Sequence, residues 1–365
     1  MRRNCLAFFL GVFAALVLGE LVCRLAEDRR ISQVLIFPRG NANYELTRPV
    51  PGDLVYEFVP GRCLNGLCTN SLGLRDLERR IVKPGGLKRI LCVGDSITMG
   101  GSMAGNVPLL QTWPLVLERL LDNPDGQRIE SWNAGFSGYN LVQYAAFLKR
   151  RAKKIKPDAI ILGLCLNDLS VHQVIHKYRD RFEIEFQHRE QAVVFDLGHG
   201  ANQWLLGHSA MWRVVNRGGA SMMEPKYGLL DPDGSRAEAA MKKIKHLAED
   251  MNIPLLALIF PRLDDEGYST PETNRDHRRL SLLVKREHVQ AVELYHLFTR
   301  YPVGSLRMDP RDKGHPNALG HCLAAIGAYR RLLDMKIPWI SSKEHRAGEC
   351  VDILAPDNRF SSSFF

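Results

Sequence analysis

Four short segments of the chain carry the residue types that acyl transfer needs. Such a reaction requires a nucleophile, a general base held by a carboxylate, and donors for the negative charge that develops on the substrate oxygen. The segments supply a serine, two further donor positions, and a histidine three residues after an aspartate. They are Gly94-Asp95-Ser96, Asn133-Ala134-Gly135-Phe136-Ser137-Gly138, Asn167-Asp168 and Asp312-Lys313-Gly314-His315-Pro316-Asn317.

Apolar runs alternate with amphipathic stretches after residue 88, and this alternation predicts an α/β fold with a five-stranded parallel sheet covered by helices on both faces. The expected strands lie near 89–93, 129–132, 159–164, 254–260 and 289–294. The expected helices lie near 113–121, 141–153, 237–250 and 271–287, with a last one from Asn317 onward.

The same alternation gathers the candidate residues. Ser96 follows the first strand, Gly138 the second, Asn167 the third, and His315 comes after the last. Ligands bind at the carboxyl ends of the strands in open parallel sheets. We therefore expect the four candidates to meet at one edge of the sheet.

Over roughly residues 86 to 333 the four segments together resemble the SGNH hydrolase superfamily, the GDSL esterases and lipases. The stretch at 70–76 also resembles one found in membrane-anchored bacterial members. The resemblance implies a doubly wound, flavodoxin-like sheet and a carboxylic ester hydrolase with a Ser-His-Asp mechanism. It implies no organic cofactor and no metal.

The resemblance also assigns the catalytic roles. Ser96 is expected to be the nucleophile, His315 the general base, and Asp312 the carboxylate that orients the imidazole. A helix N-cap is the alternative role for Ser96. Asp309 is a second carboxylate close to His315, so the choice of Asp312 depends on the family pattern Asp-x-x-His-Pro.

The expected oxyanion hole consists of the backbone N–H of Ser96, the backbone N–H of Gly138 and the side-chain amide of Asn167. Gly135 is the alternative to Gly138. The chain departs from the family pattern Gly-x-Asn-Asp, because Cys165 stands at the glycine position. The asparagine is retained, so the oxyanion role survives, but the cysteine fills space that a glycine leaves open.

The net charge indicates a solvated basic surface. Lys and Arg outnumber Asp and Glu by 49 to 40, which gives a formal charge of +9. Attraction to anionic glycans or phospholipid headgroups remains the alternative. No nucleic-acid-binding signature accompanies the charge, so we do not expect a nucleic acid partner. The sequence leaves the oligomeric state open.

The first thirty residues indicate export. Two arginines precede an uncharged run at 5–19, Glu20 interrupts it, and three apolar residues extend it to Arg24. The run favours an uncleaved inner-membrane anchor, with the catalytic domain in the periplasm or the exterior, over a removed signal peptide and a secreted protein.

The chain is thus expected to contain an anchor or signal at 1–30, an arm at 31–86, a hydrolase domain at 87–340 and a disordered tail at 341–365. An insertion at about 170–235 is expected to form a cap that shapes substrate access. His172 and His176 within it have the spacing of two ligands on one helix face. Without a third ligand we expect no metal there.

Cys63 and Cys68 are expected to form a disulfide. They flank Asn65-Gly66, a strong two-residue hairpin signal. In such a hairpin they form the non-hydrogen-bonded pair outside Leu64 and Leu67, with Cα atoms about 4.5 Å apart. Two free thiols in a surface loop are the alternative.

The sequence therefore predicts a serine hydrolase that cleaves acyl esters, with O-acetyl groups on a cell-surface or extracellular polysaccharide as the substrate suggested by export. The first alternative is an O-acyltransferase that uses the same triad. The second is a non-catalytic envelope scaffold or glycan-binding protein, which does not need a complete triad.

Overall fold

The computed structural model describes the following residues: 2–28, 46–50, 53–54, 56–64, 66–102, 105–122, 127–169, 173–178, 181–186, 209–212 and 235–340. The chain forms two compact units. One takes in Met1–Pro49 and His172–Pro232, and the other takes in Val50–Val171 and Asp233–Phe365. The segment at 341–365, predicted to be a disordered tail, lies outside the described residues.

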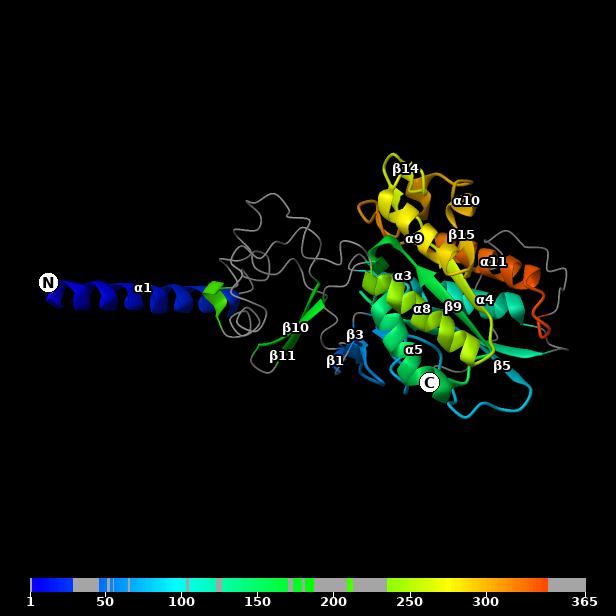
Figure 1. The fold of residues 1–365 in the computed structure, drawn as a ribbon, viewed down its shortest axis with the longest axis horizontal. Helices are drawn as coiled ribbons and strands as arrows, with labels where there is room; N and C mark the ends of the chain where they lie inside the picture. Colours follow the sequence, from blue (N-terminus) through cyan, green and yellow to red (C-terminus); the bar gives the residue numbers. More distant parts are fainter. Residues whose placement is uncertain are drawn as a thin grey trace. The chain divides into compact units, whose positions relative to one another are not determined.

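The core of the second unit is a five-stranded parallel sheet in the order β15-β12-β9-β5-β8 (Figure 1). Its strands are β5 (Leu87–Gly94), β8 (Arg128–Gly135), β9 (Ala159–Leu164), β12 (Leu255–Ile259) and β15 (Gln290–Glu293). In chain order the first strand lies between the second and the third, which is the flavodoxin-like order. The prediction of a doubly wound sheet is confirmed.

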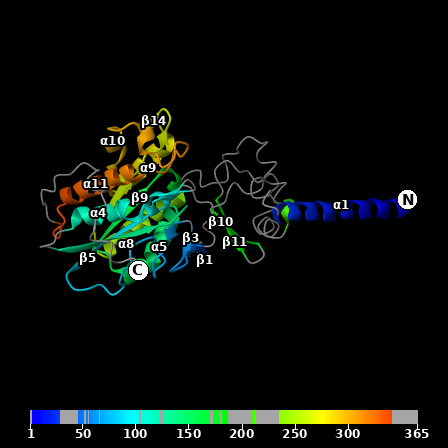
Figure 2. The same ribbon diagram turned by 180° about the vertical axis from the view of Figure 1, so that it is seen from behind.

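Helices cover both faces of this sheet. On one face α4 (Trp113–Leu121) and α11 (Ala318–Asp334) pack against each other; on the other lie α5 (Leu141–Ile155), α8 (Ser235–Asp250) and α9 (Arg275–Arg286) (Figure 1 and, from behind, Figure 2). Every residue of β9 is buried between these layers. This double burial explains why the strand is a continuous apolar run instead of an alternating one.

The other elements described in this unit are short. They are β2 (Tyr56–Phe58), β3 (Cys63–Leu64), β4 (Leu67–Cys68), α3 (Ser96–Met99), β6 (Gly101–Ser102), β7 (Gly105–Asn106), η2 (Leu109–Gln111), η3 (Leu166–Leu169), β13 (Leu263–Asp264), β14 (Gly267–Tyr268), α10 (Tyr295–Phe298) and η4 (Val303–Leu306).

Asparagine side chains fix where three of the helices begin. Asn140, Asn274 and Asn317 each accept backbone N–H groups from the first turn of α5, α9 and α11. Such a cap satisfies donors that the helix itself leaves unpaired. The helix predicted at 271–287 therefore begins later, because a turn around Thr270 occupies the residues before Asn274.

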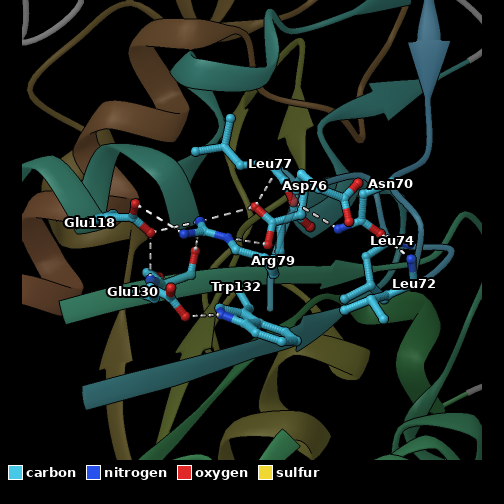
Figure 3. Close-up of polar contacts among 12 residues, drawn as sticks. Asn70, Leu72, Leu74, Asp76, Leu77, Arg79, Glu118, Glu130 and Trp132 are labelled. Atoms are coloured by element: carbon cyan, nitrogen blue, oxygen red, sulfur yellow. Dashed lines mark hydrogen bonds and ion pairs between the residues drawn. The ribbon is translucent and has the colours of Figure 1, made fainter. Parts of the chain in front are cut away.

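A buried charged network ties the arm to the sheet layer (Figure 3). The Arg79 guanidinium donates from Nε to Asp76 at 3.0 Å and from Nη2 to Glu118 of α4 at 2.7 Å. The side chains of Arg79 and Asp76 are 5% and 0% exposed. Glu118 also accepts the Ser131 N–H of β8 at 2.6 Å. One cation between two carboxylates thus links the arm to α4 and β8, and removal of Arg79 would leave both carboxylates without their cation.

The hairpin of the arm carries a disulfide. Cys63 and Cys68 face each other across β3 and β4, with their Cα atoms 4.1 Å apart, and their sulfur atoms are bonded. Leu64 and Leu67 form the inner pair, as the turn signal predicts. The bond closes the turn in which Gly66 adopts a φ of 77°.

The first unit contains α1 (Arg2–Asp28), β1 (Thr47–Pro49), and the antiparallel pair β10 (Gln173–Tyr178) and β11 (Arg181–Phe186). Within this unit the Glu20 carboxylate of α1 accepts hydrogen bonds from the N–H groups of Ala210 and Met211, each at 3.0 Å. Among the described residues, no helix combines the length and apolar character that a membrane crossing requires.

The spacing of His172 and His176, which would suit two ligands on one helix face, does not correspond to a helix at His176. His176 lies in β10, opposite Glu183 of β11. His172 lies outside the described residues. The β-branched residues Val174 and Ile175 next to His176 favour a strand at this position.

Candidate active site

Ser96 begins a short helix directly after the first strand of the sheet. β5 ends at Gly94, and Asp95 caps α3 by accepting the Ile97 N–H at 2.9 Å. A Cβ atom at position 94 would lie 1.9 Å from the Thr98 Oγ1, so the tight turn requires glycine. This turn holds the Ser96 hydroxyl at the carboxyl edge of the sheet.

His315 and Asp312 share the loop between η4 and α11. The Asp312 Oδ1 accepts the N–H groups of Gly314 at 2.9 Å and of His315 at 3.0 Å. The Met308 N–H donates to the His315 carbonyl at 3.0 Å and closes the loop. These hydrogen bonds within the loop hold the imidazole and the carboxylate in one geometry.

Ser96, His315 and Asp312 form a continuous hydrogen-bonded chain. The Ser96 Oγ lies 2.8 Å from the His315 Nε2, and the His315 Nδ1 lies 3.0 Å from both carboxylate oxygens of Asp312. An ionised carboxylate can only accept, so Nδ1 carries the ring hydrogen and Nε2 accepts from the hydroxyl. The arrangement can take a proton from Ser96 as its oxygen attacks a carbonyl carbon.

Asp312 is held in its ionised form. Partial burial acts to raise its pKa, but the hydrogen bond and charge of His315 and the two backbone N–H donors outweigh burial. The pKa of Asp312 therefore lies well below its ordinary value. A carboxylate that stays charged can stabilise the imidazolium that forms during proton transfer.

Gly138 follows β8 much as Ser96 follows β5, because Gly94 and Gly135 are paired across these neighbouring strands. The φ of Gly138 is 75°, which L side chains rarely adopt. The N–H of Gly135 already donates to the Asn133 Oδ1 at 3.0 Å. Gly138 thus lies just beyond the end of β8 in a backbone conformation that favours glycine.

Asn167 lies in η3, just beyond β9, and its side chain is anchored next to the nucleophile. Its Nδ2 donates to the Asp95 Oδ2 at 3.3 Å, and its Oδ1 accepts from the Cys165 thiol. Asn167 itself is exposed, whereas both of its partners are buried. The structure therefore brings the amide to the sheet edge that carries Ser96.

The side chains of Asp95, Cys165 and Asp168 form a buried cluster whose ligand atoms lie within 4.8 Å of one another. Burial and the neighbouring Asp95 raise the pKa of Asp168 well above its ordinary value. Burial and the two carboxylates raise the pKa of the Cys165 thiol in the same way. Metal ligands must be deprotonated, so this chemistry suits a hydrogen-bonded network and does not suit a metal site. That the reaction needs no metal stays a prediction.

The β13–β14 hairpin, which the sequence did not single out, supports the catalytic loop. The Leu263 N–H donates to the Lys313 carbonyl at 2.8 Å, and the Arg307 Nε donates to the Leu263 carbonyl at 2.9 Å. Asp265 pairs with Arg307 at 2.8 Å and with Lys313 at 2.6 Å. In the sequence, the acidic turn before Gly267 could have indicated this support, because its negative charge complements the positive charge of the basic residues on both sides of Asp312.

A second serine, histidine and carboxylate are linked in the same unit. The Ser269 Oγ lies 3.1 Å from the His277 Nδ1, and the His277 Nε2 lies 2.9 Å from Glu293. Ser269 and His277 are only 4% and 0% exposed, and the Ser269 Oγ already accepts the Arg262 N–H at 2.8 Å. This buried set anchors the base of the β13–β14 hairpin and offers no approach to a substrate.

Comparison with known proteins identifies the domain that carries the Ser96 site. The family model for the GDSL-like lipase/acylhydrolase family matches residues 92–323. No curated protein matches the chain in sequence.

Several solved structures are similar over most of their length. A member of the lipolytic G-D-S-L family from Veillonella parvula is 15% identical over 69% of this chain and 100% of its own, with a TM-score of 0.40. A lipase/acylhydrolase from Enterococcus faecalis is 12% identical over 68% and 96%, with the same TM-score. Axe2, an acetylxylan esterase from Geobacillus stearothermophilus, is 15% identical over 70% and 97%, again at 0.40. Sequence identities and TM-scores this low assign neither an activity nor a substrate to this chain.

Proposed function

Because the chain belongs to the GDSL-like lipase/acylhydrolase family and is an ester hydrolase of that type, we propose that it works by a Ser-His-Asp mechanism. Ser96 is the nucleophile, His315 the general base and Asp312 the carboxylate that orients the base. The observation that carries this proposal is the hydrogen-bonded chain from the Ser96 Oγ through both ring nitrogens of His315 to Asp312. Each contact has the length that proton transfer requires.

In the first half of the reaction the Ser96 oxygen bonds to the ester carbonyl carbon, and its proton passes to the His315 Nε2. The tetrahedral intermediate collapses, the bond to the alcohol oxygen breaks, and the imidazolium returns the proton to the departing alcohol. In the second half water bonds to the acyl carbon and gives a proton to the His315 Nε2. The bond from the acyl carbon to the Ser96 Oγ then breaks, the imidazolium returns its proton to that oxygen, and the carboxylic acid leaves.

The oxyanion is stabilised by the backbone N–H groups of Ser96 and Gly138 and by the Asn167 amide. The left-handed backbone at Gly138 and the hydrogen bond from Asn167 to Asp95 support these assignments. Each such donor contributes on the order of a hundredfold to turnover, because it acts on charge that develops only in the transition state.

The proposed substrate is an O-acetyl ester on a cell-surface or extracellular polysaccharide. Two features support a location outside the cytosol: the apolar N-terminal run behind two arginines, and the Cys63–Cys68 disulfide, which an oxidising compartment favours. Sequencing of the mature N-terminus, with protease digestion of spheroplasts and of the culture medium, tests the location. A chain that is absent from the medium and stays protected from protease in spheroplasts would contradict export.

Ester hydrolysis is tested with the purified full chain and p-nitrophenyl esters of increasing acyl length, followed by acetylated glycans and lipid esters. We expect acetyl release from the activated ester and from the glycan, with no activity in Ser96→Ala at unchanged thermal unfolding. Acetyl label that passes to an acceptor sugar would favour acyl transfer. An inert wild type that still binds glycan would favour a scaffold.

A further inference from the structure

Cys165 contacts two parts of the proposed oxyanion site from a position where the family usually has glycine. It is 8% exposed, directly after β9. Its single S–H has two acceptors within reach, the Asp95 Oδ2 at 3.0 Å from the Sγ and the Asn167 Oδ1. One side chain thus contacts both the residue before the nucleophile and the amide that faces the substrate.

We propose that the Cys165 thiol is a positioning residue for the oxyanion donor. Together with Asp95 it holds the Asn167 amide in one orientation, with one N–H bound to Asp95 and the second N–H left for the substrate oxygen. This inference deepens the proposed ester hydrolysis and depends on it.

The two ends of the Asn167 amide have different partners, and this difference fixes its orientation. The Asp95 carboxylate only accepts, so the NH₂ end must face it. The Cys165 S–H has the Asp95 Oδ2 and the Asn167 Oδ1 as acceptors, so it supports the orientation in which the carbonyl end faces the sulfur. A flipped amide would set its oxygen against the Asp95 carboxylate and would remove the acceptor that Asn167 offers to the S–H.

The surroundings keep the thiol in its donor form and in its place. Burial and the nearby carboxylates Asp95 and Asp168 raise the pKa of Cys165 well above its ordinary value, so the sulfur keeps its hydrogen. The Cys165 N–H donates to the Asp168 Oδ2 at 2.6 Å, and the Tyr144 hydroxyl donates to the Asp168 Oδ1 at 2.5 Å. The backbone that carries the thiol is therefore anchored from the helix layer.

Loss of the thiol should affect turnover more than substrate binding. Asn167 is exposed, so without the S–H its amide is free to turn toward solvent. A donor that must be reoriented during the reaction stabilises the transition state less than a preorganised donor does. The ground-state carbonyl carries little charge, so KM should hardly change.

The test compares Cys165→Ala with Cys165→Ser, in the full chain, for hydrolysis of p-nitrophenyl acetate. Alanine removes the donor and keeps the Cβ, whereas serine keeps a donor at nearly the same place. We expect Cys165→Ala to lower kcat about tenfold with KM within about twofold, and Cys165→Ser to stay within about threefold of wild type. Thermal unfolding checks that each variant is folded. If Cys165→Ala is unstable, Cys165→Gly takes its place, with the same expected loss of kcat.

A second arm places Cys165→Ala in an Asn167→Ala background, where no further loss of kcat is expected because the positioned group is gone. Three results would overturn the inference: wild-type kcat in the donor-free variants, an equal loss in Cys165→Ser, or the same loss in the Asn167→Ala background. An inert wild type would overturn the proposed hydrolysis and this inference with it. An active wild type with unaffected variants overturns the inference alone.

Discussion

The Ser96 Oγ lies 2.8 Å from the His315 Nε2, although 219 residues separate the two. Neither residue reaches the other through local structure. The turn after β5 holds the serine, and the loop before α11 holds the histidine, at the same edge of one sheet. This relationship makes the loop around Asp312 the first place to test how the site works.

Asp312→Asn should lower kcat about a thousandfold with little change in KM. An amide can donate to the His315 Nδ1, which favours the tautomer in which Nε2 carries the hydrogen and cannot take one from Ser96. The matched control is Asp309→Asn, because Asp309 lies in the same loop but accepts its hydrogen bonds from Arg311. Steady-state kinetics on an activated acetyl ester checks both. A larger loss in the Asp309 variant would move the orienting role to that residue.

Asn167→Ala should lower kcat by about a hundredfold or more, because the variant loses a donor to the developing oxyanion. Asn167→Asp keeps the shape, removes the donor, and should lose as much. The measurement is a Michaelis–Menten analysis of both variants. A rise in KM at constant kcat would instead assign Asn167 to ground-state binding.

Asp265→Asn should lower kcat by about two- to fivefold, because it weakens the ion pairs that hold Arg307 and Lys313 on either side of Asp312. The effect is small because Asp265 is 61% exposed and water screens both pairs. Asp264→Asn is the control, since Asp264 pairs with Arg262 instead. The loss should shrink at high salt, and a loss that is independent of salt would argue against the ion pairs.

His321 should make stability depend on pH. It is fully buried in α11, and its Nδ1 accepts the Trp113 N–H at 3.1 Å. Burial, helped by the charges of Arg75 and His315, lowers its pKa to about 3. The unfolded value is about 6.5, so the unfolded chain binds the extra proton first as the pH falls. The folded state therefore loses stability as the pH falls from about 6.5 to about 3. Above about pH 6.5 neutral His321 costs the folded state no stability.

His321→Asn isolates this contribution, because the Asn Oδ1 can still accept from Trp113 but does not titrate. Between pH 7 and 4 the free energy of unfolding should fall about 3 kcal/mol more in wild type than in the variant. Urea titrations at pH 7, 5 and 4 measure the difference. Parallel pH profiles would show that His321 is not the titrating group.

The sheet and the site edge were predictable because each depends on local patterns. Buried runs ended by glycine or polar motifs mark β5 and β9, and the doubly wound topology then brings their carboxyl ends to one edge. Residues whose partners are distant were not predictable. Arg75 belongs to the stretch at 70–76, whose resemblance indicates lineage alone, yet its guanidinium donates to the carbonyls of Met99 and Val107 behind the nucleophile, each at 2.6 Å.

The same limit applies to Cys165 and His176. The sequence marks Cys165 only as a departure from the family pattern that fills space, and only the three-dimensional contacts reveal its polar partners. The spacing of His176 suggested a helix face, but pairing with β11 decides its conformation. Strand pairing depends on a partner segment, so residue spacing within one segment cannot determine it.

The central claim is that His315 activates Ser96 as the nucleophile, and covalent labelling with a fluorophosphonate tests it most directly. Peptide mass spectrometry of the labelled wild type should locate one adduct, on Ser96. The adduct should be absent in Ser96→Ala and form at least about a hundredfold more slowly in His315→Ala. An adduct on another serine such as Ser269, or labelling of Ser96 at an unchanged rate without His315, would contradict the account.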